Sequence, residues 1–264
     1  MKYIISLLFI LQAIINCDHF AIAQNPMRDT HRCRGGDFKS NIQKIRDSAL
    51  DKLLALLKKN SSYNGFYHSQ EGAKPEEQVS ASFLCTPKVH SLCECCFKNV
   101  VASLRKGCPK QNEGVAWGSY NFNTCIVRYS TGRKILSVLD DWAWHSSFFP
   151  DDFVQAVELE KTVDSLASKL KEQAAGGDAL KKYAQGSVNY DNDELSLFMV
   201  MQCTPDLTKG DCVKCLSKAS VELRSCCTRK KIFIARVVST NCYAWYSHVS
   251  FFTPPSRFDS NDCS

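Results

Sequence analysis

The stretch QCTPDLTKGDCVKC, residues 202–215, sets three cysteines at fixed spacing at the start of a run that reads as a helix. A similar stretch begins at Cys85-Thr86-Pro87. Corresponding cysteines in the two halves are separated by 117 to 119 residues: Cys85 and Cys203, Cys93 and Cys212, Cys96 and Cys215, Cys108 and Cys227, Cys125 and Cys242. Five pairs at nearly one offset indicate that the chain is a tandem of two related domains.

Hydrophobic periodicity predicts the same elements in both copies. Apolar residues recur with helical spacing over 40–57 and, less regularly, over 153–171, where Gly176-Gly177 follows as a stop signal. A second helix is expected in each copy at the cysteine cluster, over 93–104 and 212–223. Short β-rich runs surround it: 83–84, 115–120, 124–129, 195–202, 232–238 and 242–246. Each copy is therefore predicted to be an α+β unit, two helices packed on an antiparallel sheet. We expect the domains to span 24–150 and 151–264.

The N-terminus predicts export. Lys2 precedes an apolar run over residues 4–15, and Ala21-Ile22-Ala23 supplies the small residues of a cleavage site, so 1–23 is expected to be a signal peptide. An uncleaved N-terminal membrane anchor is the alternative. Cleavage removes Cys17 from the fifteen cysteines, which leaves an even number for an oxidising compartment. No later stretch is a transmembrane candidate, and Asn60-Ser61-Ser62 is a predicted glycosylation site.

The motif Cys203-x8-Cys212-x2-Cys215 and its surroundings resemble the plant stress-antifungal domain, also called the ginkbilobin-like domain. Two such domains behind a signal peptide resemble a cysteine-rich repeat secretory protein. The resemblance covers nearly all of the mature chain and implies a sheet of about five strands in each domain. The first copy departs from the motif, because seven residues separate Cys85 from Cys93 and Cys95 is additional.

The resemblance also implies a disulfide pattern, in which the first of six cysteines pairs with the fifth, the second with the third and the fourth with the sixth. The implied bonds are Cys33–Cys108, Cys85–Cys93, Cys96–Cys125, Cys203–Cys212 and Cys215–Cys242. The second copy has no cysteine before its long helix, where the first of the set belongs. Cys95, Cys226, Cys227 and Cys263 therefore have no implied partner, and their pairing stays open.

No catalytic or metal-binding pattern stands out. The C-x-x-C pairs Cys93/Cys96 and Cys212/Cys215 suit zinc or redox chemistry, but they lie in separate repeats of an exported chain. The histidines at positions 31, 68, 90, 145 and 248 have no hydrolase context. The acidic pairs Asp140-Asp141 and Asp151-Asp152 read as solvated or helix-capping residues rather than as paired catalytic acids. We therefore predict no enzyme activity, no metal and no cofactor.

The function predicted from these features is extracellular binding in stress, defence or cell-surface signalling, in the apoplast. The net charge of +6 and the basic stretches Lys58-Lys59, Arg105-Lys106 and Arg229-Lys230-Lys231 leave a directly acting antifungal or antimicrobial protein as the alternative. The partner is expected to be a cell-wall or microbial glycan or a cell-surface receptor, and not nucleic acid. The oligomeric state stays open.

Carbohydrate is the most specific ligand class that the resemblance suggests. A mannose-binding antifungal member of that family uses an Asn beside the first cysteine, an Arg after the fifth and a Glu near the sixth. Here the first cysteine stands in His31-Arg32-Cys33-Arg34, so the Asn is missing, although Arg229 and Arg236 fall in the interval expected of the Arg in the second copy. Three aromatic residues remain as sugar platforms or as core residues: Trp117, Tyr120 and Trp245.

Overall fold

The computed structural model describes residues 29–59, 65–86, 90–120, 123–150, 156–178, 181–190, 195–228 and 232–250. The expected signal peptide, Asn60 and Cys263 lie outside these ranges. Within them the elements are, in chain order, β1 (Thr30–Asp37), α2 (Ser40–Lys59), β2 (Phe66–Glu71), the 3-10 turn η1 (Pro75–Glu77), β3 (Val79–Cys85), α3 (His90–Gly107), β4 (Gln111–Tyr120), β5 (Asn123–Thr131), β6 (Trp144–Pro150), α4 (Ala156–Ala175), β7 (Lys182–Tyr190), β8 (Leu195–Cys203), α5 (Lys209–Cys226), β9 (Ile232–Ser239) and β10 (Cys242–Ser247).

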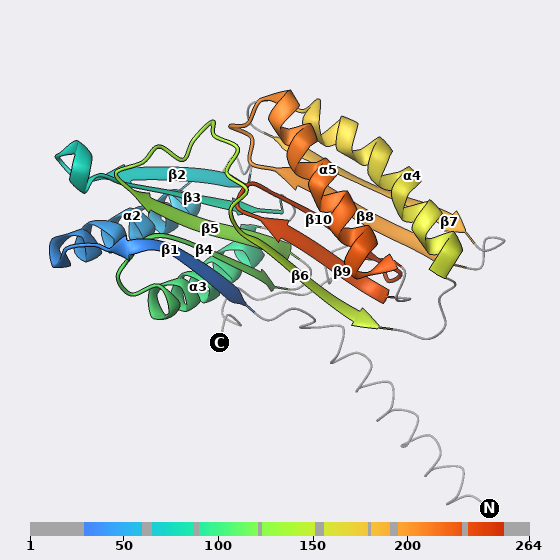
Figure 1. Ribbon diagram of the computed structural model, residues 1–264, viewed down its shortest axis with the longest axis horizontal. Coiled ribbons are helices and arrows are strands. Elements are labelled where there is room, and N and C mark those ends of the chain that lie inside the picture. The colour runs from blue at the N-terminus through green and yellow to red at the C-terminus, as the bar shows by residue number, and fades with distance from the viewer. Residues whose placement is uncertain are drawn as a thin grey trace, which may run out of the picture.

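The strands form two antiparallel sheets whose strand orders repeat. The first sheet runs β1-β4-β5-β3-β2 and the second β6-β9-β10-β8-β7. Helices α2 and α3 pack on the first sheet, and α4 and α5 pack on the second (Figure 1). The predicted tandem of α+β units, each with five strands and two helices, is confirmed.

Local sequence determines where the helices begin and end. Thr208 caps α5, because its hydroxyl accepts a hydrogen bond from the backbone N–H of Asp211 at 3.1 Å while the Asp211 carboxylate lies 2.8 Å from the same hydroxyl. Helix α4 ends at Ala175, where the Gly176 N–H bonds the Glu172 carbonyl at 2.9 Å. The predicted stop at the two glycines is confirmed.

Strand β6 belongs to the second sheet, where it pairs with β9 from Trp144↔Ser239 to Pro150↔Ile232. It occupies the place that β1 has in the first sheet. The expected boundary at residues 150 and 151 stays a prediction, and the pairing of β6 favours an earlier one. In the sequence, the aromatic residues of β6 read as the end of the first copy. In the structure, β6 pairs with a strand of the second copy. We propose that the first domain ends between Thr131 and Trp144.

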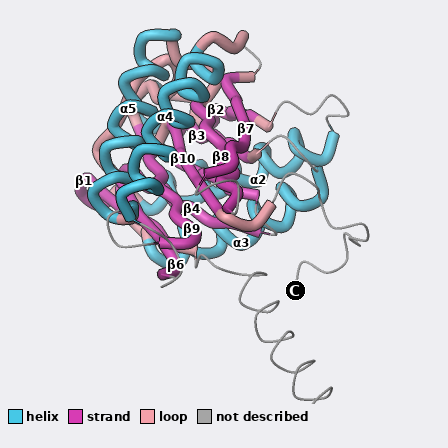
Figure 2. Tube along the Cα trace, turned by 90° about the vertical axis from the view of Figure 1, so that its right-hand side faces the viewer, coloured by secondary structure: helices cyan, strands magenta, loops and turns pink. Residues whose placement is uncertain are grey.

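The two sheets pack face to face between the helices, in four layers (Figure 2). Side chains on each strand alternate between a core under the helices and a third core between the sheets. On β4, for example, Ala116 faces the helices while Val115 and Trp117 face the other sheet. We call this third core the interdomain seam; it consists of Leu84, Val115, Trp117, Ile126, Ala143, Val200, Ile234, Val238, Tyr243 and Trp245. Because both faces of each sheet are covered by apolar contacts, the two domains form one body.

We expect Trp117→Phe to weaken this packing. The Trp117 indole, fully buried, donates to the Ser239 carbonyl across the seam at 2.7 Å, and its loss leaves that carbonyl unpaired at a cost of about 1–3 kcal/mol. Urea unfolding measures the change. Trp144→Phe is the matched control, because the indole of the half-buried Trp144 bonds the Asp141 carbonyl where water can replace the donor; there the change should be smaller, about 0.5–1 kcal/mol. Equal effects of the two substitutions would contradict the role given to the buried bond.

Candidate functional site

A buried arginine from the first domain anchors one end of the interdomain seam. Arg128 on β5 is 4% exposed. Its guanidinium donates to the Ser82 hydroxyl at 3.3 Å, to the Ile135 carbonyl at 2.6 Å and to the Asn241 side-chain oxygen at 3.3 Å. Burial lowers the pKa of Arg128, and the nearby carboxylates of Asp206 and Asp140 act in the opposite direction. The side chain therefore joins three parts of the chain at once: the first sheet, the segment between the domains and the second domain.

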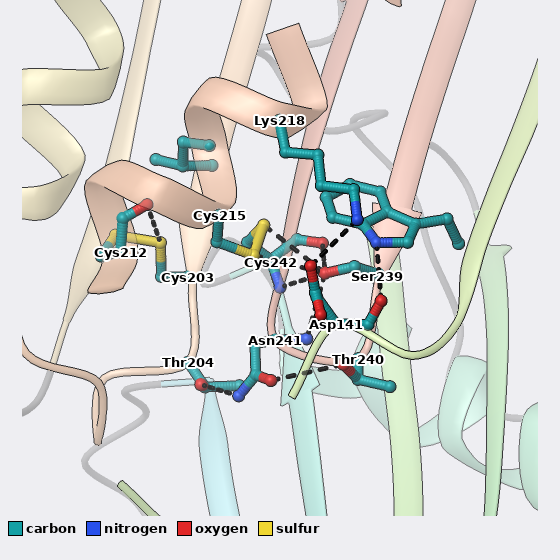
Figure 3. The surroundings of a disulfide bond; sticks show 12 residues. Asp141, Cys203, Thr204, Cys212, Cys215, Lys218, Ser239, Thr240, Asn241 and Cys242 are labelled. Carbon is teal, nitrogen blue, oxygen red and sulfur yellow. Dashed lines mark hydrogen bonds and ion pairs between the residues drawn. A yellow bond between two sulfur atoms is a disulfide. The ribbon is translucent and has the colours of Figure 1, made fainter. Parts of the chain in front are cut away.

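Asn241 receives that arginine at the turn between β9 and β10. Its side-chain oxygen also accepts the Asp140 N–H at 2.9 Å, and its side-chain NH2 donates to the Thr204 hydroxyl at 3.2 Å. Figure 3 shows this turn beside the Cys215–Cys242 disulfide. At the start of β10, the Cys242 N–H donates to the Ser239 hydroxyl at 3.1 Å. The disulfide and the turn together fix the acceptor that Arg128 needs.

A tyrosine links the two domains further along the seam. The Tyr243 hydroxyl donates to the Gln202 side-chain oxygen at 2.7 Å, so the Thr86 hydroxyl, 2.6 Å away, donates to Tyr243. Gln202 in turn donates to the Cys85 carbonyl at 3.4 Å. Thr86 and Gln202 flank the motif cysteines of their copies, which places the two motifs against each other.

At the other side of the seam, Arg236 on β9 is fully buried and donates to the Gly118 carbonyl at 2.8 Å. Burial lowers the pKa of Arg236 to about 10. His145 on β6 stacks on the Trp117 indole, with ring centroids 6.1 Å apart. Burial, together with the positive charges of Arg236 and Arg32, lowers the pKa of His145 to about 4. The imidazole is therefore neutral near pH 7.

The segment between the domains forms the roof of a hollow of about 680 Å3 on the first domain. We call it the linker hollow; it is lined by Lys52, His68, Ser69, Gln70, Pro75, Gln78, Ser80, Ala81, Gly132, Arg133, Lys134, Ile135 and Leu136. Two contacts hold the roof in place. The Gly132 N–H bonds the Gln78 carbonyl at 2.7 Å with φ +68° at the glycine, and Arg128 holds the Ile135 carbonyl from below.

The chemistry of the linker hollow suits a polar ligand without positive charge. Its lining offers ammonium, guanidinium, imidazole, amide and hydroxyl groups, and no carboxylate is among the described residues that line it. Lys52 and Arg133 are paired with carboxylates outside the lining, at 2.6 Å to Glu71 and 2.7 Å to Glu113. Lys134 is exposed at the rim. Hydroxyl-rich or anionic groups match this set of donors.

The structure contains five disulfides between the pairs that the resemblance implies: Cys33–Cys108, Cys85–Cys93, Cys96–Cys125, Cys203–Cys212 and Cys215–Cys242. Among the cysteines left open, Cys226 is bonded to its neighbour Cys227. Cys95 is disulfide-bonded as well.

The other residues that the sequence analysis singled out are dispersed. His31 bonds the Ser103 hydroxyl at 3.3 Å and His248 lies against Tyr190, far apart in the fold from His68 in the linker hollow. Trp117 and Trp245 are at most 2% exposed, so they are core residues and not open sugar platforms. Tyr120 packs against the first core.

Charged residues named in the sequence analysis are largely paired. Asp140 binds Arg133 and Arg34, and Asp141 binds Lys218 at 2.9 Å. Arg105 binds Asp47 and Asp51, and Lys58 lies 3.6 Å from Glu94. Asp151-Asp152 and Arg229-Lys230-Lys231 lie outside the described residues, and so does every atom of the expected cleavage site.

The sequence analysis did not predict the linker hollow. It also did not predict that Arg128 and Arg236 are buried in the seam. Arg236 entered only as a candidate sugar ligand, and its full burial rules out contact with a soluble sugar. The sequence feature that could have indicated the seam is Arg128, an arginine within an otherwise β-rich run of the first copy.

In the part of the chain that the structure describes, no three His, Cys, Asp or Glu side chains gather as metal ligands. No helix there is both long and apolar enough to cross a bilayer.

The family model and the similar sequences indicate the same protein family. The family model described as "Salt stress response/antifungal" matches residues 29–132 and 151–249. Cysteine-rich repeat secretory protein 1 of Arabidopsis thaliana is 32% identical over 208 residues, which cover 78% of this chain and 59% of the relative. Cysteine-rich receptor-like protein kinase 29 of the same plant is 30% identical over 67% of this chain but only 26% of its own length. The chain thus spans less than two thirds of the length of each of these two relatives.

Solved structures share the fold. The tandem DUF26 ectodomains of the Arabidopsis thaliana cysteine-rich receptor-like proteins PDLP8 and PDLP5 superpose with TM-scores of 0.65 and 0.61, at 19% and 20% identity. Each comparison covers 84% of this chain and 98% of the ectodomain.

The lowered pKa of His145 predicts a pH-dependent stability. Its pKa falls from 6.5 to about 4 on folding, so the unfolded chain binds more protons between these values. Stability is therefore lost as the pH falls from 6.5 towards 4. His145→Gln should reduce the difference in unfolding free energy between pH 7 and pH 4.5 by about 1–2 kcal/mol, less than the full shift implies because the ring is half-exposed.

Urea unfolding at the two pH values measures this difference. Ser146→Ala is the control, since Ser146 neighbours His145 on β6 but is paired with Val237 on the helix-facing side of the sheet. The same loss of pH dependence in both variants would contradict the assignment to His145.

Proposed function

Because the chain belongs to the salt stress response/antifungal family, we propose that it is an extracellular binding protein that acts in stress responses or cell-surface signalling. Its relatives include a secretory protein and a receptor-like kinase, which supports a place outside the plasma membrane, in the apoplast. Cleavage after residue 23 and glycosylation at Asn60 belong to this proposal. We propose further that the chain binds its ligand without chemical conversion.

The observation that carries the proposal is the linker hollow. Its roof belongs to the segment between the domains, and Arg128 binds both the roof at Ile135 and the second domain at Asn241. A tandem of rigidly joined modules with a hollow at their junction is suited to recognition. If each copy acted separately, the two domains would not need to be joined rigidly.

Carbohydrate is the ligand that we propose for this hollow. The amide groups of Gln70 and Gln78 and the hydroxyl groups of Ser69 and Ser80 are donors and acceptors of the kind that sugar hydroxyls require. Lys134 at the rim adds a positive charge that favours acidic sugars of cell walls. The site differs from the mannose triad of the resembling family, whose residues are not retained here.

The experiment is a glycan array of plant and fungal wall oligosaccharides, with a pull-down from wall extract beside it. We expect the wild-type chain to bind at least one glycan, and Lys134→Glu to weaken that binding about tenfold. Lys44→Glu is the matched control, because Lys44 is an exposed lysine on α2 that does not line the hollow. Binding that survives Lys134→Glu unchanged would remove the hollow as the site, and the absence of any ligand would overturn the proposal.

A growth-inhibition assay at graded salt separates binding from direct antimicrobial action. Charge-driven contact with a fungal wall or membrane fades as salt is added. The pairing of Arg105 and Lys58 with acidic residues reduces the free basic surface in the described part of the chain. We therefore expect no inhibition, and inhibition that disappears with salt would favour the antimicrobial alternative.

A further inference from the structure

The position of the missing first cysteine in the second copy can be located from strand register. In the first sheet Cys33 lies opposite Gly114, three residues before Trp117, which faces Ile126 next to Cys125. In the second sheet the residue next to Cys242 is Tyr243, which faces Val238. Three residues before Val238 is Ala235, and the residue opposite Ala235 on β6 is Phe148.

Phe148 therefore stands where the partner of Cys227 would be. Cys108, the counterpart of Cys227, is bonded to Cys33 across 75 residues. Cys227 has no such partner and is bonded instead to the adjacent Cys226, at the end of α5. With phenylalanine at position 148, the second copy has a disulfide between neighbouring residues at the end of α5.

This disulfide differs from four of the others in exposure and from all of them in the length of the loop that it closes. Among the six whose cysteines are both described, four have both cysteines at most 1% exposed: Cys85–Cys93, Cys96–Cys125, Cys203–Cys212 and Cys215–Cys242. In the Cys226–Cys227 bond, Cys226 is half-buried. In the remaining bond, Cys33–Cys108, Cys33 is half-buried as well. The stabilisation from closing a loop grows with its length, so the bond across 75 residues is favoured and the bond between neighbours is not.

We propose that Cys226–Cys227 is a thiol-exchange site, at which a small extracellular thiol such as glutathione forms a mixed disulfide with Cys226. The thiolate attacks the Cys226 sulfur, the Cys226–Cys227 bond breaks and its electron pair remains on the Cys227 sulfur. A second glutathione then attacks the glutathione sulfur of the mixed disulfide, which releases the Cys226 thiolate and oxidised glutathione. Two thiols are oxidised and one disulfide is reduced.

The location of the bond limits what exchange disturbs. The backbone N–H of Cys227 bonds the Leu223 carbonyl at 3.1 Å, so the last turn of α5 has a hydrogen bond that does not depend on the disulfide. Arg224, one turn earlier, binds Asp164 of α4 at 3.0 Å. Reduction is therefore expected to alter this end of α5 while leaving the sheets and the interdomain seam intact.

The test is to incubate the native chain with graded glutathione, alkylate with iodoacetamide and identify the modified cysteines by mass spectrometry after trypsin. The peptide from Ser225 to Arg229 reports on both cysteines. We expect it to carry glutathione on Cys226, or alkyl groups, at about one tenth of the glutathione concentration that opens Cys33–Cys108. Tryptophan fluorescence should be unchanged at that point. Opening of both bonds at the same concentration would overturn the proposal.

Two variants give an independent test. Cys226→Ser combined with Phe148→Cys should let Cys227 form a long-range bond that resists glutathione as Cys33–Cys108 does. Cys226→Ser combined with Cys227→Ser should abolish the sensitive modification and leave thermal unfolding within a few degrees of the wild type. Persistence of the glutathione adduct in the second variant would place the exchange at another cysteine and refute the assignment.

Discussion

Each sheet of this protein is apolar on both faces, and every other feature depends on how those faces are covered. Helices cover one face of each sheet, and the other sheet covers the second. Burial of apolar surface is the main favourable contribution to such packing, but it sets no register. Register comes from the polar bonds within the seam. Trp117 on β4 and Arg236 on β9 each donate to a backbone carbonyl of the opposite domain, at 2.7 and 2.8 Å.

The same constraint explains why the duplication is not symmetric. Arg128 on β5 corresponds to Trp245 on β10, so one domain supplies a buried cation where the other supplies an aromatic ring. Two cations facing each other at this place would repel, whereas an arginine against a carbonyl, an amide and a hydroxyl is satisfied. The two copies thus differ in residue type where they meet.

The asymmetry extends to the disulfides. In the first copy, Cys33–Cys108 ties β1 to the end of α3; in the second, Phe148 takes the place of the cysteine, and β6 is held by its pairing with β9 and by side-chain contacts such as the stacking of His145 on Trp117. Strand β6, which begins at Trp144, also follows in the chain after the roof of the linker hollow, whose last lining residue is Leu136. The candidate site and the lost disulfide are therefore both consequences of how the chain passes from one domain to the next.

Sequence alone was sufficient for the duplication and the helices, because cysteine spacing and helical periodicity are local signals. The five disulfide pairings came from the family resemblance and not from a local signal. It was insufficient for β6, whose aromatic residues do not show which sheet they pair with, and for the pairing of Cys226, which depends on the residue opposite Ala235. The sequence favoured Trp117 and Trp245 as core residues but left them open as sugar platforms, and the packing of the two sheets buries both. The linker hollow depends on contacts of Arg128 with residues up to 113 positions away, and no local pattern encodes a contact made only when two folded domains meet.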